Sequence, residues 1–447
     1  MQFFELLQIA IGNRSQLSHT PTAEEWREIC ALAKKQAMVG IAFCGVEQLP
    51  VEQRPPRKLW MQWYTAAERI KGLNEEMDRK VFKVARMFRR EGFQGVVLKG
   101  QGMAQLYKVE RSTVNGQRTD HPDETLLMDH ELHGLHENSG ASATISHTES
   151  TESTENFCQR DEHANIDTIT HTQACAGEDS QRLNDNVNDN QGTGKFSILN
   201  SQFSIKEYRT PGDIDIWLHG ERDEILEYVR WHVPDCKPVY HHVDFPVVDD
   251  VSIEVHFTPT WMNSPLRNRR LQRFFHSFNF QFSIFNSSEL PVPNAAFNRV
   301  YILVHIYRHL FAEGIGLRQL LDYYFVLQQG FTESEREETL RILRSLGMMR
   351  FTRAVMWVLQ EVFGMPDRYL LTSPDAKEGR FLLDEIMLAG NFGKYDERMQ
   401  RAAGEGTFRW GLRKVLRNFR FVRSYPSEVL WSPIFKVWHL FWRIRHA

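Results

Sequence analysis

The stretch YRTPGDIDIWL, residues 208–218, decides the fold of this 447-residue chain. Its Pro-Gly pair predicts a turn, and the alternation of polar and apolar residues after it predicts a β-strand. Because successive side chains of a strand point to opposite faces, Asp213 and Asp215 share one face, and Ile214 and Ile216 share the other. The strand therefore has one acidic face and one face that fits a hydrophobic core.

A second strand is predicted in SIEVHF, residues 252–257. The same alternation places Glu254 and His256 on one of its faces. A neighbouring strand of this kind could aim a third carboxylate at Asp213 and Asp215. Unit charges about 4 Å apart repel by about 4 kcal/mol at an effective dielectric of 20, so such a cluster needs a cation or protons. Oxygen ligands favour Mg²⁺ or Mn²⁺ over zinc.

Two such ions could activate an attacking hydroxyl and stabilise a leaving pyrophosphate in an in-line displacement, which is the chemistry of nucleotidyl transfer. An isolated D-x-D is also common in turns and on solvated strand edges, so its surroundings matter. Upstream, the stretch FQGVVLKGQGMAQLY predicts a short buried strand over Val96 to Leu98, a turn at Lys99 and Gly100, and then a short helix.

These segments together resemble a known family. LKGQGMAQLY, followed by YRTPGDIDIWL and a strand ending in IEVHF, is similar to the uncharacterised nucleotidyltransferase family of the polymerase-beta-like superfamily. The resemblance spans roughly residues 85–330 apart from an insertion, and its motifs are moderately specific. It implies an α+β fold with a small mixed sheet, and a metal-dependent enzyme that moves a nucleoside monophosphate from an NTP to a hydroxyl acceptor.

The resemblance also assigns roles by position. Asp213 and Asp215 become the metal pair and Glu254 the third catalytic carboxylate. Lys99 and Gly100 become the phosphate cradle, where backbone N–H groups attract anions and a lysine adds a point charge. The superfamily usually has Gly-Ser at the cradle, so the Lys-Gly pair is a departure that this family uses.

Three further polar residues are candidates. Arg209, just before the turn, is either a second phosphate contact or a solvated surface residue. Arg318 and Asp322 stand four residues apart in a predicted helix, where a surface ion pair of about 0.3 to 0.5 kcal/mol is the simplest interpretation. The resemblance places this helix beside the active site, which makes Arg318 a third nucleotide contact and Asp322 a substrate-facing residue.

The histidines allow several interpretations. His305 and His309 share one helix face, but they lack the glutamate of an H-E-x-x-H zinc site, so we expect them to face substrate or to pack. His256 is a further candidate to face substrate. His241 and His242 are adjacent on a predicted strand and should point in opposite directions, which favours structural roles over a shared ligand role.

Composition divides the chain into four parts. Residues 1–91 predict helices, 92–108 with 207–293 predict the nucleotidyltransferase core, 109–206 predict a disordered low-complexity insertion, and 294–447 predict a helical domain. Lengthening a loop from about 10 to about 100 residues costs only about 2 kcal/mol, so the two halves of the core can still pair. The insertion either leaves catalysis intact or marks a gene that is losing its function.

Charge, cysteine spacing and hydropathy limit the classes of protein to which this chain could belong. A formal net charge of −3 argues against wholesale polyanion binding. The five cysteines form no C-x-x-C pair and therefore no obvious disulfide framework or zinc knuckle. The N-terminus lacks the features of a secretory signal, and no stretch reaches the roughly 20 apolar residues of a membrane span. We therefore expect a cytoplasmic protein.

The last forty residues mix many arginines, lysines and aromatic residues with a single acid, Glu428. A segment of this composition could contact an anionic membrane surface or RNA. We favour a final helix pair packed on the bundle, because aromatic stripes at helical spacing are more often core than ligand surface. Two other functions also stay open for the whole chain. One is a glycosyltransferase that holds a nucleotide-sugar through D-x-D and a metal, and the other is an inactive binding module of the same fold.

Overall fold

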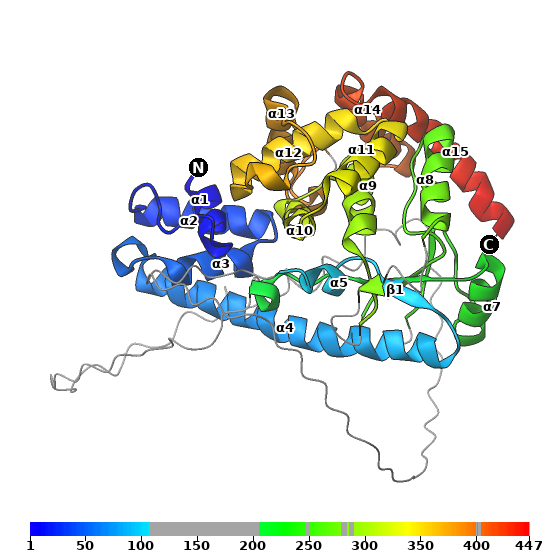
Figure 1. Cartoon of the computed structure of the whole chain (residues 1–447), viewed down its shortest axis with the longest axis horizontal. Coiled ribbons are helices and arrows are strands. Elements are labelled where there is room, and N and C mark those ends of the chain that lie inside the picture. Colours follow the sequence, from blue (N-terminus) through cyan, green and yellow to red (C-terminus); the bar gives the residue numbers. More distant parts are fainter. Residues whose placement is uncertain are drawn as a thin grey trace, which may run out of the picture. The chain divides into compact units, whose positions relative to one another are not determined.

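A computed structural model describes residues 1–107, 205–246, 251–278, 284–285, 290–398, 400 and 404–446. The described residues belong to one compact unit, built from residues 1–110 and 192–447 (Figure 1). The predicted disordered insertion, residues 109–206, lies outside the described residues except for its last two positions. The predicted α+β fold class is confirmed, since many helices surround a small mixed sheet.

The central sheet has the strand order β1-β2-β4-β3. Its strands are β1 (Gly95–Val97), β2 (Ile214–Leu218), β3 (His242–Asp244) and β4 (Ile253–His256). β2 pairs with β1 in antiparallel fashion and with β4 in parallel, and β3 closes the edge antiparallel to β4. In the β2–β4 register, Asp215 stands opposite Glu254.

The two faces of the sheet pack against different helices. Ile214 and Ile216 join a core with Val81 and Phe88 of α4 (Arg57–Arg90) and with apolar residues of α7 (Arg222–His232). Trp217, on the face of the aspartates, instead packs against aromatic rings of α8 (Pro265–His276) and α9 (Ala295–Ala312). The alternation within β2 thus gives the sheet an acidic face on the side of α9 and an apolar face that packs against α4.

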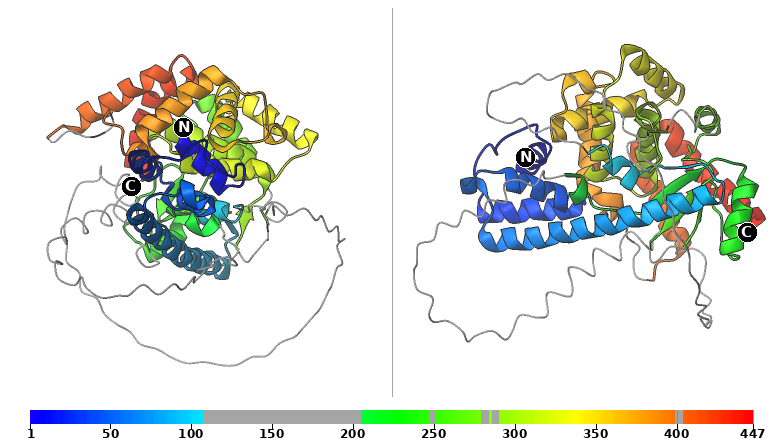
Figure 2. Two further views of the ribbon diagram at one scale, coloured as in Figure 1. Left: turned by 90° about the vertical axis from the view of Figure 1, so that its left-hand side faces the viewer. Right: turned by 60° about the horizontal axis from the view of Figure 1, so that its bottom comes forward.

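The N-terminal helices are α1 (Gln2–Ala10), α2 (Ala23–Lys35), α3 (Val39–Gln48) and the long α4, with a short 3₁₀ turn, η1, at Val51–Gln53. A capping box of Thr22 and Glu25 starts α2. The first three helices share one hydrophobic core with the C-terminal helices. α4 runs from these helices to the sheet, as Figures 1 and 2 show, and so connects the two cores.

The chain around the insertion is anchored on α4. The 3₁₀ segment η2 (Ile205–Tyr208) begins at the last two residues of the predicted insertion, and Tyr208 donates a hydrogen bond of 2.7 Å to Glu68. Lys206 Nζ lies 3.3 Å from Asp78 of α4 and 3.2 Å from Gln105, just before the insertion. The two ends of the insertion therefore meet at the same place on the helix.

The C-terminal half is a helical bundle, as predicted. Besides α9, it contains α10 (Leu317–Gln328), α11 (Glu333–Ser345), α12 (Met349–Phe363), η3 (Asp367–Tyr369), α13 (Ala376–Ala389), η4 (Asn391–Gly393), α14 (Thr407–Asn418), η5 (Phe419–Phe421) and α15 (Pro426–His446). A small hairpin of β5 (Ile284–Phe285) and β6 (Val292–Pro293) precedes α9, and α5 (Gln101–Ala104) follows β1. No helix in the described part of the chain is both long and apolar enough to cross a membrane.

Candidate active site

The acidic face of β2 carries the centre of the site. Asp215 lies within β2, and Asp213 directly precedes it. Lys99, in the turn after β1, reaches both, with its Nζ 3.1 Å from Asp213 Oδ2 and 3.1 Å from Asp215 Oδ2. The antiparallel pairing of β1 and β2 explains this contact, because the end of β1 lies beside the start of β2. One ammonium group therefore joins the two aspartates.

β4 adds the third carboxylate. His256 Nε2 lies 2.8 Å from Asp215 Oδ1 and 3.3 Å from Glu254 Oε2. The atoms that Asp215, Glu254 and His256 offer as ligands all lie within 4.8 Å of one another. The structure thus brings Asp213, Asp215, Glu254 and Lys99 together, and it also adds His256. The parallel register of β2 and β4 is what aligns the carboxylates.

Burial makes this cluster electrostatically demanding. Burial and repulsion by Asp213 raise the pKa of Asp215 to about 6. Burial also disfavours ionised Glu254, but the neighbouring His242, His256 and Lys99 outweigh it and hold the pKa of Glu254 well below its usual range. Burial would lower the pKa of His256, yet its hydrogen bonds to the two carboxylates raise it to about 9. The carboxylates are thus partly compensated by Lys99 and a protonated His256.

The donor set fits a divalent cation. Asp215 Oδ2 is buried and accepts no hydrogen bond from any described residue, although the ammonium of Lys99 lies within ion-pair distance. A buried carboxylate oxygen of this kind is costly unless a cation completes it. Asp213, Asp215 and Glu254 offer the oxygen ligands that Mg²⁺ and Mn²⁺ prefer. These three residues could therefore hold such an ion.

Gly100 shapes the turn beside the aspartates. It has φ +59°, which favours glycine, and an added Cβ would lie 3.2 Å from the carbonyl oxygen of Asp213. The turn therefore approaches the acidic strand closely because residue 100 has no side chain. α5, which follows, has only four residues. Any anion at this turn would meet single backbone N–H groups and Lys99 rather than a long helix dipole.

The prediction that His241 and His242 point in opposite directions is wrong. His242 begins β3, but His241 lies in the bend before it, where the alternation of a strand does not apply. The two rings meet, with His241 Nε2 2.9 Å from His242 Nδ1. His242 Nδ1 also lies 3.1 Å from Glu254 Oε2. The signal in the sequence was the short link between the two predicted strands, which places His242 opposite His256 in a hairpin.

Helix α9 presents a polar face near the sheet. Tyr301, His305 and Arg308 recur at helical spacing, and burial lowers the pKa of His305 well below its ordinary range. The guanidinium of Arg308 lies 4.1 Å from the ring of Trp261, which in turn lies 4.0 Å from the His241 ring. Sequence reasoning missed Tyr301 and Arg308, although their spacing relative to His305 was visible.

His305 and His309 are buried, and their ring centroids lie 4.4 Å apart. His309 Nδ1 lies 3.3 Å from Glu313 of its own helix, and Arg308 lies 3.0 Å from its other nitrogen. Burial lowers the pKa of His309, so its imidazole is neutral near pH 7. His309 therefore packs within a local network, and His305 lies between it and Tyr301.

Arg209 and Asp322 form a buried pair. Arg209 is only 3% exposed and binds Asp322 through two hydrogen bonds of 2.8 Å. Tyr107 donates a third, of 2.6 Å, to the same carboxylate. The interpretation of Arg209 as a solvated surface residue is therefore wrong, because the loop before β2 is packed under α10. The guanidinium is committed to Asp322, so we assign both residues a structural role.

Arg318 is also buried, so a surface ion pair with Asp322 is the wrong description. Its Nη1 donates to the carbonyl oxygens of Thr210 and Pro211, at 3.1 and 3.0 Å. Arg318 thereby fixes the turn that leads into the two aspartates. Its contact with nucleotide stays a prediction.

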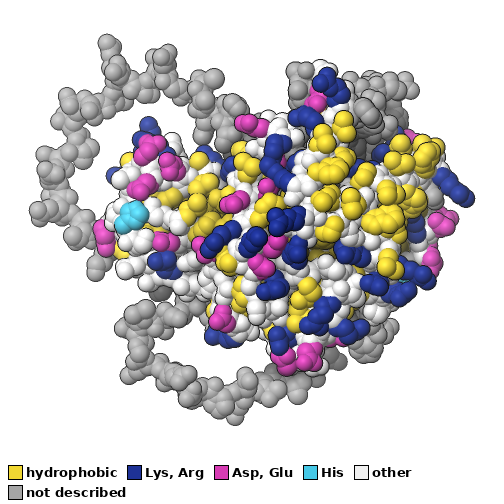
Figure 3. Space-filling model, turned by 90° about the horizontal axis from the view of Figure 1, so that it is seen from above, with side chains coloured by type: hydrophobic (Ala, Val, Ile, Leu, Met, Phe, Trp, Pro, Cys, Tyr) yellow, Lys and Arg dark blue, Asp and Glu magenta, His cyan; other side chains and the backbone are white. Residues whose placement is uncertain are grey.

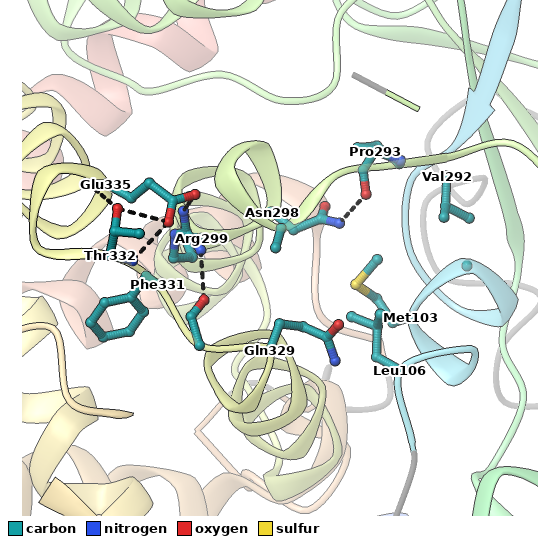
Figure 4. Close-up of a pocket in the computed structure, with 13 residues that line it drawn as sticks. Met103, Leu106, Val292, Pro293, Asn298, Arg299, Gln329, Phe331, Thr332 and Glu335 are labelled. Atoms are coloured by element: carbon teal, nitrogen blue, oxygen red, sulfur yellow. Dashed lines mark hydrogen bonds and ion pairs between the residues drawn. The ribbon is translucent and has the colours of Figure 1, made fainter. Parts of the chain in front are cut away.

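A separate cavity of about 370 Å³ lies among α5, β6, α9 and the α10–α11 connection (Figure 4). Arg299 in its wall donates to Gly330 and to Glu335, at 3.1 and 2.9 Å. None of the carboxylates of the acidic cluster lines this cavity. The cavity and the acidic cluster are therefore separate features of the described residues.

Comparison with known proteins gives one result. The profile of a family described as uncharacterised nucleotidyltransferase matches residues 22–111 and 200–364, which is more than half of the chain. The matched segments contain Lys99, the two aspartates and Glu254. No curated protein and no solved structure matches the chain. The chain therefore belongs to the uncharacterised nucleotidyltransferase family.

Proposed function

We propose that the protein transfers a nucleoside monophosphate from an NTP to a hydroxyl acceptor, with Mg²⁺ or Mn²⁺ as cofactor. The observation that carries this proposal is the convergence of Asp213 and Asp215 on one ammonium group, with Glu254 opposite Asp215 on the adjacent parallel strand. Membership of the family supports the class of reaction. A bound divalent ion would supply Lewis-acid stabilisation of the transferring phosphoryl group.

The residues of the chain would divide the work. Asp213, Asp215 and Glu254 would hold the ion. His256 donates to Asp215 Oδ1 and thereby leaves Oδ2 of that carboxylate to face Lys99. Lys99 would contact the phosphates as a point charge, and Gly100 lets the backbone approach them. Arg318 would act by holding the turn before Asp213 in place.

The test is incubation of the protein with each labelled NTP, magnesium and cell extract, followed by a search for a labelled acceptor. Nucleotidyl transfer predicts a labelled acceptor together with pyrophosphate. Release of a nucleoside diphosphate from a nucleotide-sugar would instead favour the glycosyltransferase alternative. No transfer and no metal-dependent nucleotide binding would leave the inactive binding module. The Asp213→Asn/Asp215→Asn double variant serves as the blank.

The C-terminal helix supports a second proposal, contact with an anionic membrane surface. Leu430, Ile434, Val437, Phe441 and Ile444 recur at helical spacing along α15, and each is at least 55% exposed. In Figure 3, apolar side chains gather among Lys and Arg side chains on the side of the molecule where α15 lies.

The charge of α15 favours this partner. Its cations are Lys436, Arg443 and Arg445, and its single acid, Glu428, is buried and accepts a hydrogen bond from the backbone N–H of Asn263. An apolar stripe flanked by cations and free of exposed acids suits an anionic bilayer. Co-sedimentation with vesicles that contain phosphatidylserine, and not with neutral vesicles, would support the proposal. Binding to RNA but not to these vesicles would contradict the proposal. Unchanged vesicle binding in Phe441→Glu would also contradict it.

A further inference from the structure

Three imidazoles and one carboxylate meet at the β3–β4 edge of the sheet. His241 Nε2 lies 2.9 Å from His242 Nδ1. Glu254 Oε2 lies 3.1 Å from His242 Nδ1 and 3.3 Å from His256 Nε2. The ligand atoms of the three histidines all lie within 4.8 Å of one another. The three histidines thus form one cluster, and Glu254 contacts two of them.

The spacing matches a small tetrahedral site. Zinc–nitrogen bonds of about 2.0 to 2.1 Å place neighbouring ligand atoms about 3.3 Å apart in a tetrahedron. Three of the six separations between the four ligand atoms, 2.9, 3.1 and 3.3 Å, lie close to this value. The ring centroid of His242 lies 4.2 Å from that of His241 and 5.3 Å from that of His256, and the other pair is also 5.3 Å apart. The rings therefore surround a shared point rather than stack.

The outer nitrogens are also placed as in metal sites. Metal-bound histidines usually donate their second N–H to a carboxylate or a backbone carbonyl. His256 Nδ1 lies 3.4 Å from the carbonyl oxygen of Thr258, and His242 Nε2 lies 3.8 Å from Asp244 Oδ1. These contacts leave His242 Nδ1 to face the shared point. His256 Nε2 would exchange its proton and its 2.8 Å hydrogen bond to Asp215 Oδ1 for the bond to the ion. A carbonyl and a carboxylate outside the cluster thereby support its geometry.

The ring of His241 is buried and held on one side only. His241 is 7% exposed, and its Nδ1 has no hydrogen-bond partner among the described residues. Its Nε2 faces His242 at 2.9 Å, and this is the atom that a bound ion would take.

We propose that His241, His242 and His256, with Glu254 as the fourth ligand, bind a divalent transition-metal ion of the zinc class. Nitrogen-rich donor sets select such ions over Mg²⁺, which prefers oxygen. Glu254 would offer Oε2 to this ion and leave Oε1 for the proposed magnesium site. The ion would tie β3 to β4. This inference goes beyond nucleotide transfer and does not depend on it.

The test uses the full chain after treatment with a chelator. Zn²⁺ binding is measured by titration calorimetry, and Co²⁺ is used as a probe because tetrahedral coordination gives it strong visible absorption. The chain has 18 histidines, so stoichiometry is compared between variants. We expect His241→Gln and His242→Gln each to lose one equivalent of tight zinc, or to bind it at least about tenfold more weakly. The tetrahedral Co²⁺ spectrum should disappear with it.

His276→Gln is the matched control, because His276 is exposed on α8 and its one hydrogen bond among the described residues is to the carbonyl of Gln272 of its own helix. It should leave zinc affinity unchanged. Equal affinity in wild type and both cluster variants would overturn the proposal, as would an equal loss in His276→Gln. Circular dichroism checks that the variants fold. The Asp213→Asn variant should bind zinc as the wild type does, but bind Mn²⁺ more weakly. The zinc site and the proposed magnesium site are therefore tested separately.

Discussion

Two groups of buried charge lie on either side of the turn before β2, and they are built differently. Arg209 and Asp322 form a matched pair with two hydrogen bonds of 2.8 Å, and Tyr107 completes the carboxylate. The acidic cluster instead gathers three carboxylates around Lys99, and Asp215 Oδ2 accepts no hydrogen bond from the described residues. Breaking a buried ion pair with balanced charges destabilises the fold, whereas a buried cluster with excess negative charge is suited to bind a cation.

The largest effect should come from breaking the matched pair. Asp322→Asn leaves the Arg209 guanidinium buried without its counter-ion, which should lower the free energy of unfolding by about 3 to 5 kcal/mol. Denaturant unfolding measures this loss. The control is Asp384→Asn, since Asp384 is exposed on α13. The apolar double variant Arg209→Met/Asp322→Leu should recover much of the stability. A loss below about 1 kcal/mol in Asp322→Asn would mean that the pair is not structural.

A substitution in the acidic cluster should have little effect on stability and a large effect on activity. Asp213→Asn removes one of the mutually repelling carboxylates, so we expect the free energy of unfolding to change by less than about 1 kcal/mol. Metal-dependent nucleotide transfer should fall at least about 100-fold, because a proposed metal ligand is lost. Asp223→Asn, on the exposed start of α7, is the matched control. Unchanged turnover in both Asp213→Asn and Asp215→Asn would refute the catalytic assignment.

Lys99 tests how the cluster is compensated. Its ammonium lies 3.1 Å from both aspartates, so it competes with any divalent cation for them. Lys99→Met should therefore bind Mn²⁺ more tightly without nucleotide, and bind NTP about tenfold more weakly, because a phosphate contact of about 1.4 kcal/mol is lost. Calorimetric titration with each ligand separates the two effects. A parallel weakening of both would show that Lys99 only supports the fold.

Gly100 probes the distance between the turn and the acidic strand. Gly100→Ala should cost about 1 to 2 kcal/mol through its positive φ and its contact with the Asp213 carbonyl. Gly92→Ala is the control, since Gly92 also has positive φ, of +86°, but open space at the Cβ position. Thermal unfolding of both variants isolates the contact. Nucleotide affinity should fall in Gly100→Ala alone.

The smallest effect on the two charge groups should come from the insertion, since both groups lie outside it. Replacing residues 112–204 by a short Gly-Ser linker should change the free energy of unfolding by no more than about 2 kcal/mol, the closure entropy of the loop. Lys206 and Gln105 already hold the two ends together, at 3.2 Å. Differential scanning calorimetry is the measurement. A large drop in the melting temperature would show that the insertion is structural.

Much of the fold was predictable because it depends on local patterns. The helices of the bundle follow apolar residues at helical spacing, and the strands β2 and β4 follow strict alternation. The domain boundaries stay predictions, and the insertion lies outside the described residues. The candidate carboxylates were also predictable, since alternation alone decides that Asp213 and Asp215 share a face. The metal that they bind stays a proposal.

The sequence by itself determined which side chains share a strand or helix face, because backbone geometry fixes that over a few residues. Only the tertiary structure decided their partners. Arg209 meets Asp322, 113 positions away, because the loop before β2 packs under α10. The rings of His241 and His242 meet because the chain bends before β3. The bend depends on long-range packing, which the spacing of polar and apolar residues does not predict. Long-range packing, rather than residue type, therefore separated structural charge from the charge available for chemistry.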